Sequence, residues 1–109
     1  IIKTIPQELL LTPVTGNSNE MPKNYFLGQN YPNPFNPVTV IKFGVTKPGL
    51  VKITVYDITG KVVSELINNN LNPGSYEVQW DGSAYSSGVY FYSISTNEFA
   101  ETKKMILVK

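Results

Sequence analysis

The chain is short and close to electrical neutrality, which limits the functions it can perform. Its 109 residues include nine basic residues, all of them Lys, and eight acidic ones, and 41% of the residues are hydrophobic. That is enough apolar material for the core of one small domain. A net charge of +1 gives no basic face of the kind that nucleic acid or an anionic membrane surface attracts. The absence of His and Cys removes the commonest acid–base group, thiol nucleophiles, disulfides and the usual transition-metal ligands.

The first part of the chain differs in composition from the rest. Residues 1–5 are apolar apart from a Lys and a Thr, whereas residues 12–22 are polar, contain Pro and show no periodicity, as linkers do. We expect residues 1–24 to be a linker or the tail of a preceding domain, with an added edge strand from residues 1–5 as the alternative. The start lacks Met and a signal-peptide pattern, so we expect upstream polypeptide that carries any export signal. No apolar run reaches the roughly 18 residues of a membrane-spanning helix.

From Tyr25 onward, short apolar runs alternate with turn residues, a pattern typical of antiparallel sandwiches. Within each run every second residue is apolar, so one face of each strand should be buried. We therefore predict an all-β domain over residues 25–109, an immunoglobulin-like antiparallel β-sandwich of roughly six or seven strands, with Trp80 at the centre of the core. In chain order, the residues expected to face inward are Ile41, Phe43 and Val45; Val51, Ile53 and Val55; Tyr76, Val78 and Trp80; Tyr90, Tyr92 and Ile94; and Met105 and Leu107.

Turn residues separate these runs. Lys47–Gly49 and Asn72–Gly74 contain Pro-Gly, and Asp57–Gly60 has Asp first and Gly last, as type I turns prefer. Thr96–Glu98 should form the last hairpin, and we expect a loop at the Asn68-Asn69-Asn70 run.

The residues that could support catalysis are few. Asp57 and Asp81 each lie at the end of a predicted strand near Gly, where Asp commonly caps a turn; a pair of carboxylates for glycoside hydrolysis is the alternative. Ser86-Ser87-Gly88 does not match a nucleophile elbow. A calcium ion held by Asp81 and neighbouring carbonyls is conceivable. We predict a domain that is not an enzyme and has neither a metal site nor a cofactor.

Aromatic residues suggest a second class of function. Tyr85 is expected in a loop, and Tyr56, Tyr90, Phe91 and Tyr92 lie on predicted strands. Strand aromatics usually pack on the two faces of a sheet, but an exposed set could bind sugars. A carbohydrate-binding or adhesive accessory domain and a purely structural spacer therefore remain alternatives.

The segment before the first long strand is unusually rich in Pro and Asn. Pro cannot donate to a strand ladder, so this segment should be extended and lie at an edge, with Tyr31 and Phe35 inserted into the sandwich. Its residues are Asn30, Tyr31, Pro32, Asn33, Pro34, Phe35, Asn36 and Pro37.

This segment, followed by Thr39–Phe43, resembles the opening of the type A C-terminal sorting domain of the Bacteroidetes type IX (Por) secretion system. The resemblance continues through Val51–Val63, through Leu71–Gly82, and through Gly88, Val89 and Tyr90. It ends with Thr102–Lys109, in the same order and spacing. Similar sandwich sequences also resemble the immunoglobulin-like part of flagellar hook-capping proteins and accessory modules of secreted hydrolases.

The resemblance implies an export tag. The translocon would recognise the folded domain and carry an attached N-terminal cargo from the periplasm across the outer membrane, to the cell surface or the medium. A sortase-like component would then commonly remove the tag. The cut would fall in the linker before Tyr25. The resemblance also makes the end of the chain the part most tied to signalling, although a plain last strand with solvated Lys is the alternative. These recognition residues are Lys103, Lys104, Met105, Ile106, Leu107, Val108 and Lys109.

Overall fold

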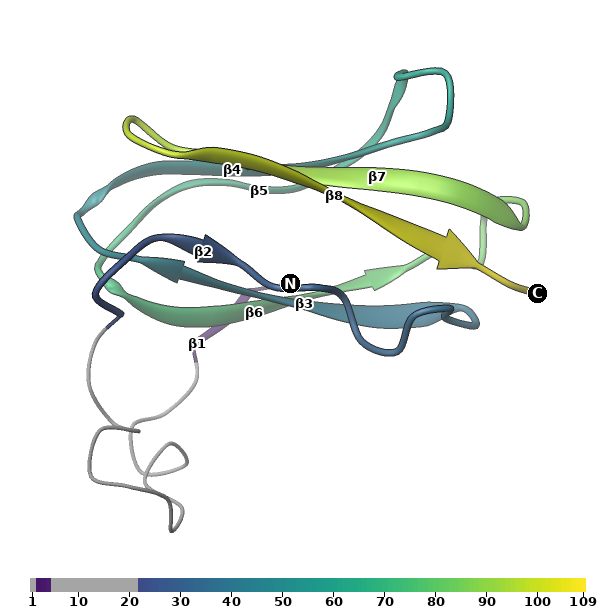
Figure 1. Ribbon diagram of the computed structural model, residues 1–109, viewed down its shortest axis with the longest axis horizontal. Coiled ribbons are helices and arrows are strands. Elements are labelled where there is room, and N and C mark those ends of the chain that lie inside the picture. Colours follow the sequence, from purple (N-terminus) through teal and green to yellow (C-terminus); the bar gives the residue numbers. More distant parts are fainter. Residues whose placement is uncertain (1, 5–21) are drawn as a thin grey trace, which may run out of the picture.

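The computed structural model describes residues 2–4 and 22–109, and their strands form two antiparallel sheets that pack face to face (Figure 1). The first sheet has the order β1-β6-β3-β2 and the second the order β5-β4-β7-β8. The predicted all-β sandwich is confirmed, with six strands of eight residues or more and two short ones, β1 and β2. The strands are β1 (Ile2–Thr4), β2 (Phe26–Leu27), β3 (Val38–Val45), β4 (Gly49–Tyr56), β5 (Val62–Leu71), β6 (Gly74–Asp81), β7 (Gly88–Ser95) and β8 (Ala100–Leu107).

The period-two pattern places the core where the sequence predicts it. Every inward residue predicted from the alternation is buried, together with Leu27, Phe35 and Ile67. Trp80 is buried, but it lies near the end of β6 and packs against Phe35 and Tyr90, so it anchors one end of the core rather than its centre. Side chains in the middle of the strands, such as Ile41, are completely enclosed.

The loop predicted at the Asn run is wrong, and this is the clearest error in the predicted elements. Asn68, Asn69 and Asn70 belong to β5, where they pair with residues 50–52 of β4, and all three side chains are exposed. A strand at the edge of a sheet can carry polar side chains on both faces, because its backbone is satisfied by one neighbour while water reaches the rest. The chain turns only afterwards, at residues 72 and 73.

The start of the described domain is packed against both sheets. Tyr25 stacks on Phe99 with ring centroids 5.6 Å apart, and β2 pairs with the end of β3. Gly44 leaves room for Phe26 there, because a Cβ at this position would overlap the ring of Phe26 and lie 3.2 Å from Pro22. The boundary predicted near residue 24 remains a prediction, and most of the expected linker lies outside the described residues. Ile2–Thr4 pair with β6 as an outer strand of this sheet.

Within residues 2–4 and 22–109, no helix has the length and apolar character needed to span a membrane.

Candidate recognition surface

The segment of residues 30–37, here called the motif segment, joins the two sheets at one edge of the sandwich. Tyr31 exchanges two backbone hydrogen bonds of 2.9 Å with Val40 on β3. A few residues later, Phe35 N–H donates to the carbonyl of Ile106, and Val108 N–H donates to the carbonyl of Phe35, both at 2.9 Å. The motif segment therefore lies beside both β3 and the end of β8, and connects them through backbone bonds.

Phe35 anchors this segment in the core. Its side chain is 1% exposed, and its ring packs against Trp80 at 5.7 Å between centroids. Gly82 allows this approach, because a Cβ there would lie 3.1 Å from Leu107 Cδ2 and 3.4 Å from the Phe35 ring. Tyr31, expected to insert in the same way, is instead 80% exposed. Tyr31 pairs directly with Val40, and directly paired residues share one face of a sheet. Since Thr39 and Ile41, on either side of Val40, are buried, that shared face is the outer one.

A buried polar network fixes the start of the motif segment. The Asn30 side chain, only 2% exposed, donates to the hydroxyl of Thr39 at 2.9 Å and to the Pro32 carbonyl at 3.1 Å. Its oxygen accepts a bond of 2.7 Å from Gln29 Nε2. The Tyr92 hydroxyl accepts from Asn30 N–H and donates to the Gly28 carbonyl. Every polar atom of the buried amide thus has a partner, as buried polar groups require.

The same network perturbs the ionisation of Tyr92. Burial raises the pKa of its hydroxyl to about 12, although the bond from Asn30 N–H opposes this shift and the charge of Glu101 adds to it. The group stays protonated at any physiological pH, so it can donate to Gly28 and hold the two segments together.

Side chains of the motif segment and of Gln29, the residue before it, also cap the outer edge of β8. Asn33 Oδ1 accepts a bond of 3.1 Å from Ile106 N–H, and Gln29 Nε2 donates to the Lys104 carbonyl at 2.9 Å. An edge strand with unpaired backbone groups tends to pair with other chains. The motif segment satisfies that edge along the last part of β8.

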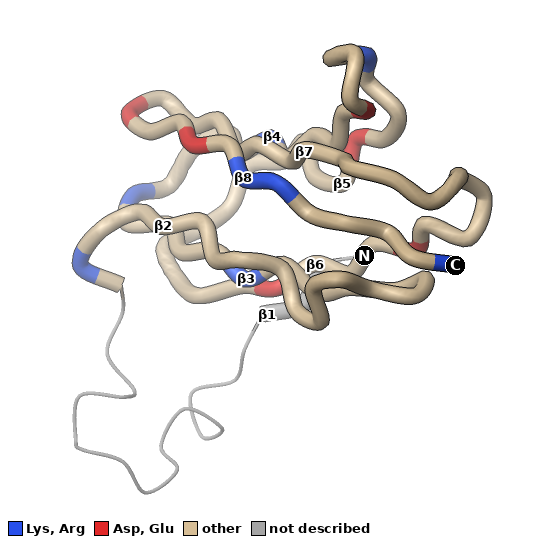
Figure 2. The backbone as a smooth tube through the Cα atoms, turned by 45° about the vertical axis from the view of Figure 1, so that its right-hand side comes forward, with Lys and Arg blue, Asp and Glu red and all other residues tan. Residues whose placement is uncertain are grey.

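The C-terminal tail, residues 103–109, alternates between buried and exposed positions. Met105 and Leu107 are buried in the core, whereas Lys104, Val108 and Lys109 are exposed. Lys103 and Ile106 are half-buried, and Lys103 lies 3.3 Å from a carboxylate oxygen of Glu101. The tail is thus a core strand on one face and a solvent-facing strip with Lys104 on the other. Figure 2 marks the Lys residues of β8 and of the C-terminus along the backbone.

The end of the chain is tied to the loop before β7. Lys109 N–H donates to the Ser87 hydroxyl at 3.0 Å, and Lys109 Nζ donates to the Ser83 carbonyl at 2.7 Å. Gly88, Val89 and Tyr90 follow directly. All three segments singled out in the sequence therefore meet at one end of the sandwich.

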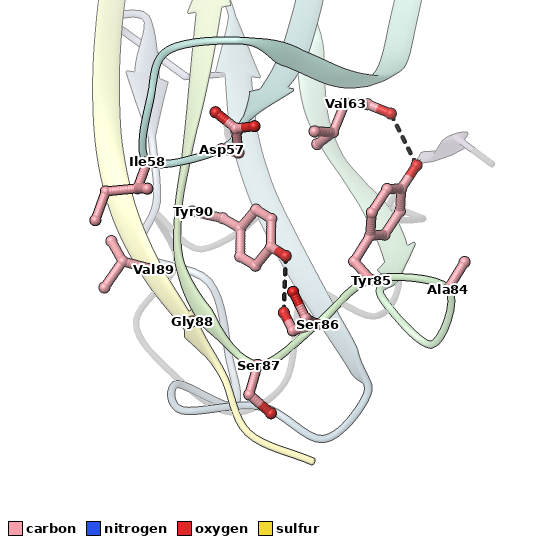
Figure 3. A pocket seen from close by; sticks show the side chains of 10 residues that line it. All are labelled: Asp57, Ile58, Val63, Ala84, Tyr85, Ser86, Ser87, Gly88, Val89 and Tyr90. Carbon is pink, nitrogen blue, oxygen red and sulfur yellow. Dashed lines mark hydrogen bonds between the residues drawn. The ribbon is translucent and has the colours of Figure 1, made fainter.

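A shallow depression of about 550 Å³ lies between the loop before β7 and the hairpin of residues 57–61 (Figure 3). Tyr85 and Tyr90 line it, but their hydroxyls donate to the carbonyls of Val63 and Ser86. The Tyr85 ring also packs at 5.5 Å from Trp80. Tyr85 is therefore a half-buried residue that packs against Trp80.

The two Asp residues considered for catalysis cap turns. Asp57 Oδ1 accepts from the hydroxyl and N–H of Thr59 and from Lys61 N–H, while Gly60 N–H closes the turn onto the Asp57 carbonyl with a positive φ of 88°. These bonds, the Thr59 hydroxyl foremost, lower the Asp57 pKa below its usual 3.8, and the Ser83 backbone bond lowers that of Asp81. Both carboxylates cap turns, as expected of an Asp at a strand end near Gly. In the described part of the chain, no three His, Cys, Asp or Glu side chains gather to hold a metal ion.

Contacts between distant residues were not visible in the sequence. Gln29 bonds to Lys104 across 75 residues and Tyr92 to Asn30 across 62. The alternation of apolar residues marks Tyr92 only as a core residue. For Gln29, the only sequence feature that could have indicated its role is its position directly before the motif segment.

Comparisons with known proteins agree with this arrangement. A search of curated proteins finds no match to the chain. The family model described as the secretion system C-terminal sorting domain matches residues 29–109, which is well over half of the chain and includes the motif segment, the loop before β7 and the tail. The chain therefore belongs to the C-terminal sorting domain family of the type IX (Por) secretion system, a membership that implies a signal for secretion across the outer membrane by that machinery.

Proposed function

We propose that this domain is an export and sorting signal that the type IX translocon recognises in its folded form. It directs an N-terminally attached cargo protein from the periplasm across the outer membrane, to the cell surface or the medium, and a sortase-like component then removes it. The observation that carries the proposal is the hydrogen-bonded union of the motif segment with the C-terminal tail. These two parts are about 70 residues apart in sequence (Asn33 and Ile106 are separated by 73), so their shared surface exists only after folding.

The exposed side of this union is the proposed recognition surface. The tail contributes Lys104, Val108 and Lys109, and the motif segment contributes Tyr31 and Asn36, all exposed. The buried residues Met105, Leu107 and Phe35 anchor the backbone that carries these side chains. A partner that reads several of them at once would discriminate folded from unfolded cargo, because the unfolded chain does not present them together.

Packing at the N-terminal boundary restricts where a sortase-like component could cut. Pro22 and Phe26 lie over Gly44, and Tyr25 stacks on Phe99. Proteases need an extended, accessible backbone, which packed segments do not offer. We therefore place the cut on the N-terminal side of Pro22, and the mass of the released domain would test this.

The proposal is tested with a fluorescent reporter that carries a periplasmic signal at its N-terminus and residues 1–109 at its C-terminus. It is expressed in a bacterium with an intact type IX system and in a translocon mutant. We expect the reporter outside the intact cells and in the periplasm of the mutant. Retention of a folded reporter in the periplasm of both strains would contradict the proposal and favour the accessory-binding alternative, which a panel of immobilised polysaccharides would then test.

A matched pair of variants tests the tail separately. Lys104→Glu reverses an exposed charge on β8, and Lys52→Glu makes the same change at an exposed position on β4 of the same sheet. If the tail contacts the translocon, Lys104→Glu should reduce export about tenfold or more, as loss of a close charge contact does at an interface, while Lys52→Glu should not. Equal export of the two variants would remove Lys104 from the recognition surface.

A further inference from the structure

Among the residues that the structure describes, the two sheets have four edges, and three of these are protected by features of residues 22–109. β2 is only two residues long, and so short an edge strand offers little backbone to another chain. β5 has two register shifts against β4, and irregularities of this kind twist an edge away from a flat partner. The end of β8 is capped by the motif segment and Gln29.

The fourth edge is that of β6, and it is covered by β1 (Figure 1). β6 pairs with β3 over all eight of its residues, and its buried side chains Tyr76, Val78 and Trp80 give it the character of an inner strand. On its other side it pairs only with Ile2–Thr4, opposite residues 76–78. Without β1, the long strand β6 would itself be an edge, with a row of backbone groups open to other chains.

β1 differs from the other three protections because it comes from the far side of the expected linker. Residues 5–21 connect it to the rest of the domain, and the cut proposed above falls on the N-terminal side of Pro22. A cut anywhere between Thr4 and Pro22 would leave β1 attached to the cargo and β6 in the released domain. The strand and the edge that it covers are thus on one chain before the cut and on two chains after it.

The pairing of β1 with β6 is too short to hold two separate chains together. Three paired residues share only a few backbone hydrogen bonds, each with a small net contribution, and the entropy lost in ordering a strand opposes them. A contact of this size binds no tighter than about 1 mM between separate chains, so at about 10 µM only about 1% of them would be paired. In the intact chain, the connection supplies an effective concentration in the millimolar range, which is enough to populate the paired state.

We infer that β1 is a removable cover on the edge of β6, and that cutting the chain between Thr4 and Pro22 opens this edge. Before the cut, β1 shields the backbone of residues 76–78 from other chains. After the cut, the released domain carries an open edge strand that can accept an extended segment by strand addition. The inference rests on the proposed function for the removal of the domain in the cell, but the pairing of β1 and its loss can be measured on the purified chain.

The test uses the full 109-residue chain with a recognition sequence for a specific protease inserted after Gly16. Hydrogen exchange of the backbone amides, followed by mass spectrometry, is compared before and after the cut. We expect exchange in part of β6 to become about tenfold faster or more, since the amides that pointed at β1 lose their partners. The amides of β4, which has a strand on each side, should be unchanged and report that the domain is still folded.

Substitutions in β1 test the same cover in the uncut chain. Along an antiparallel strand, hydrogen-bonded and non-hydrogen-bonded positions alternate. Lys3→Pro combined with Thr4→Pro therefore removes an N–H group that faces β6, whichever of the two residues carries it. We expect β6 of this uncut variant to exchange as it does in the cut wild type. Lys3→Val combined with Thr4→Val is the matched control, because it keeps both N–H groups and favours a strand, so it should behave like the uncut wild type.

Any of three results would overturn the inference. If β6 exchanges at the same rate in the uncut wild type and the uncut Pro variant, β1 does not cover it. If β6 stays protected after the cut and the N-terminal fragment co-elutes with the domain in size-exclusion chromatography, the pairing does not depend on the connection. If β6 stays protected in a monomeric domain that has lost the fragment, its edge does not depend on β1 for protection.

Analytical ultracentrifugation before and after the cut shows what becomes of the opened edge. A monomer with fast exchange in β6 supports the inference, with the edge left open. A dimer that forms only after the cut, with the fragment lost, also supports it, because a second copy then takes the place of β1. The export assay of the reporter tests the proposed function separately, so the failure of either one leaves the other standing.

Discussion

Replacement of Phe35 by Ala is the sharpest test of how the motif segment is held. The side chain is buried and packs on Trp80 beside Leu107 and Gly82, so its removal leaves a cavity that the backbone bonds to Ile106 and Val108 prevent from closing. Truncating a buried Phe costs about 3–5 kcal/mol. A domain of this size has a free energy of unfolding of about 5–10 kcal/mol, so about half of its stability should be lost.

Urea unfolding of the full 109-residue chain, followed by Trp fluorescence, measures this effect. A loss of about 3 kcal/mol should lower the urea midpoint by about 2 M, since m-values of small domains lie near 1–2 kcal/mol/M. Tyr31→Ala is the control, because Tyr31 belongs to the same segment but is 80% exposed, and exposed substitutions usually change stability by less than about 0.5 kcal/mol. Equal effects of the two variants, or a loss below about 1 kcal/mol for Phe35→Ala, would refute the reasoning.

Three other predictions concern single groups. Tyr92→Phe leaves Asn30 N–H and the Gly28 carbonyl without their partner and should lower the free energy of unfolding by about 1–3 kcal/mol. The pKa of Tyr92 is raised from 10.0 to about 12, so the wild type should lose about 2–3 kcal/mol of stability as the pH rises through that interval. Tyr92→Phe should remove this part of the loss, as urea unfolding between pH 9 and 12 would show. Gly44→Ala should displace Phe26 and expose β2 to hydrogen exchange while the middle of β3 stays protected, because the added Cβ overlaps only the Phe26 ring and Pro22. Asp57→Ala should lower the thermal midpoint at neutral pH, and the difference from the wild type should vanish as the pH falls below 3.8 and through the lowered pKa of Asp57; a difference that persists in acid would contradict the turn-capping role.

The strands could be predicted because burial on one face imposes a period of two. In β3, β4, β6, β7 and the end of β8 this constraint acts on every second residue, and the alternation in the sequence is correspondingly clear. It is weak in β5, whose pattern of exposure shows only Ile67 fully buried. The composition of Asn68–Asn70 then suggested a loop. Local sequence cannot distinguish a polar edge strand from a loop, because the difference lies in whether a neighbouring strand is present to pair with it.

The candidate site was predictable in its parts but not in its assembly. The motif segment and the tail each drew attention through unusual composition or family resemblance. Nothing in either segment indicates that Asn33 would meet Ile106 or that Gln29 would meet Lys104. Tyr31 and Phe35 are equivalent by residue type and spacing, and only the backbone pairing of Tyr31 with Val40 decides which ring enters the core. Such choices depend on contacts between residues that are distant in the sequence and adjacent in the folded structure.

The alternation within the tail determines how its role in export should be tested. Deleting Lys103–Lys109 removes exposed Lys104 and Lys109, but it also removes Met105 and Leu107 from the core, each worth about 2–5 kcal/mol, and the partner of the motif segment with them. A truncated cargo would therefore stay in the periplasm whether the tail is read by the translocon or merely completes the fold. Met105→Ala and Lys104→Glu separate the two roles, since the first weakens folding with the exposed face intact and the second alters that face alone. If the tail acts only as a strand, export should follow the free energy of unfolding across both variants; if it is recognised, Lys104→Glu should reduce export with an unchanged urea midpoint.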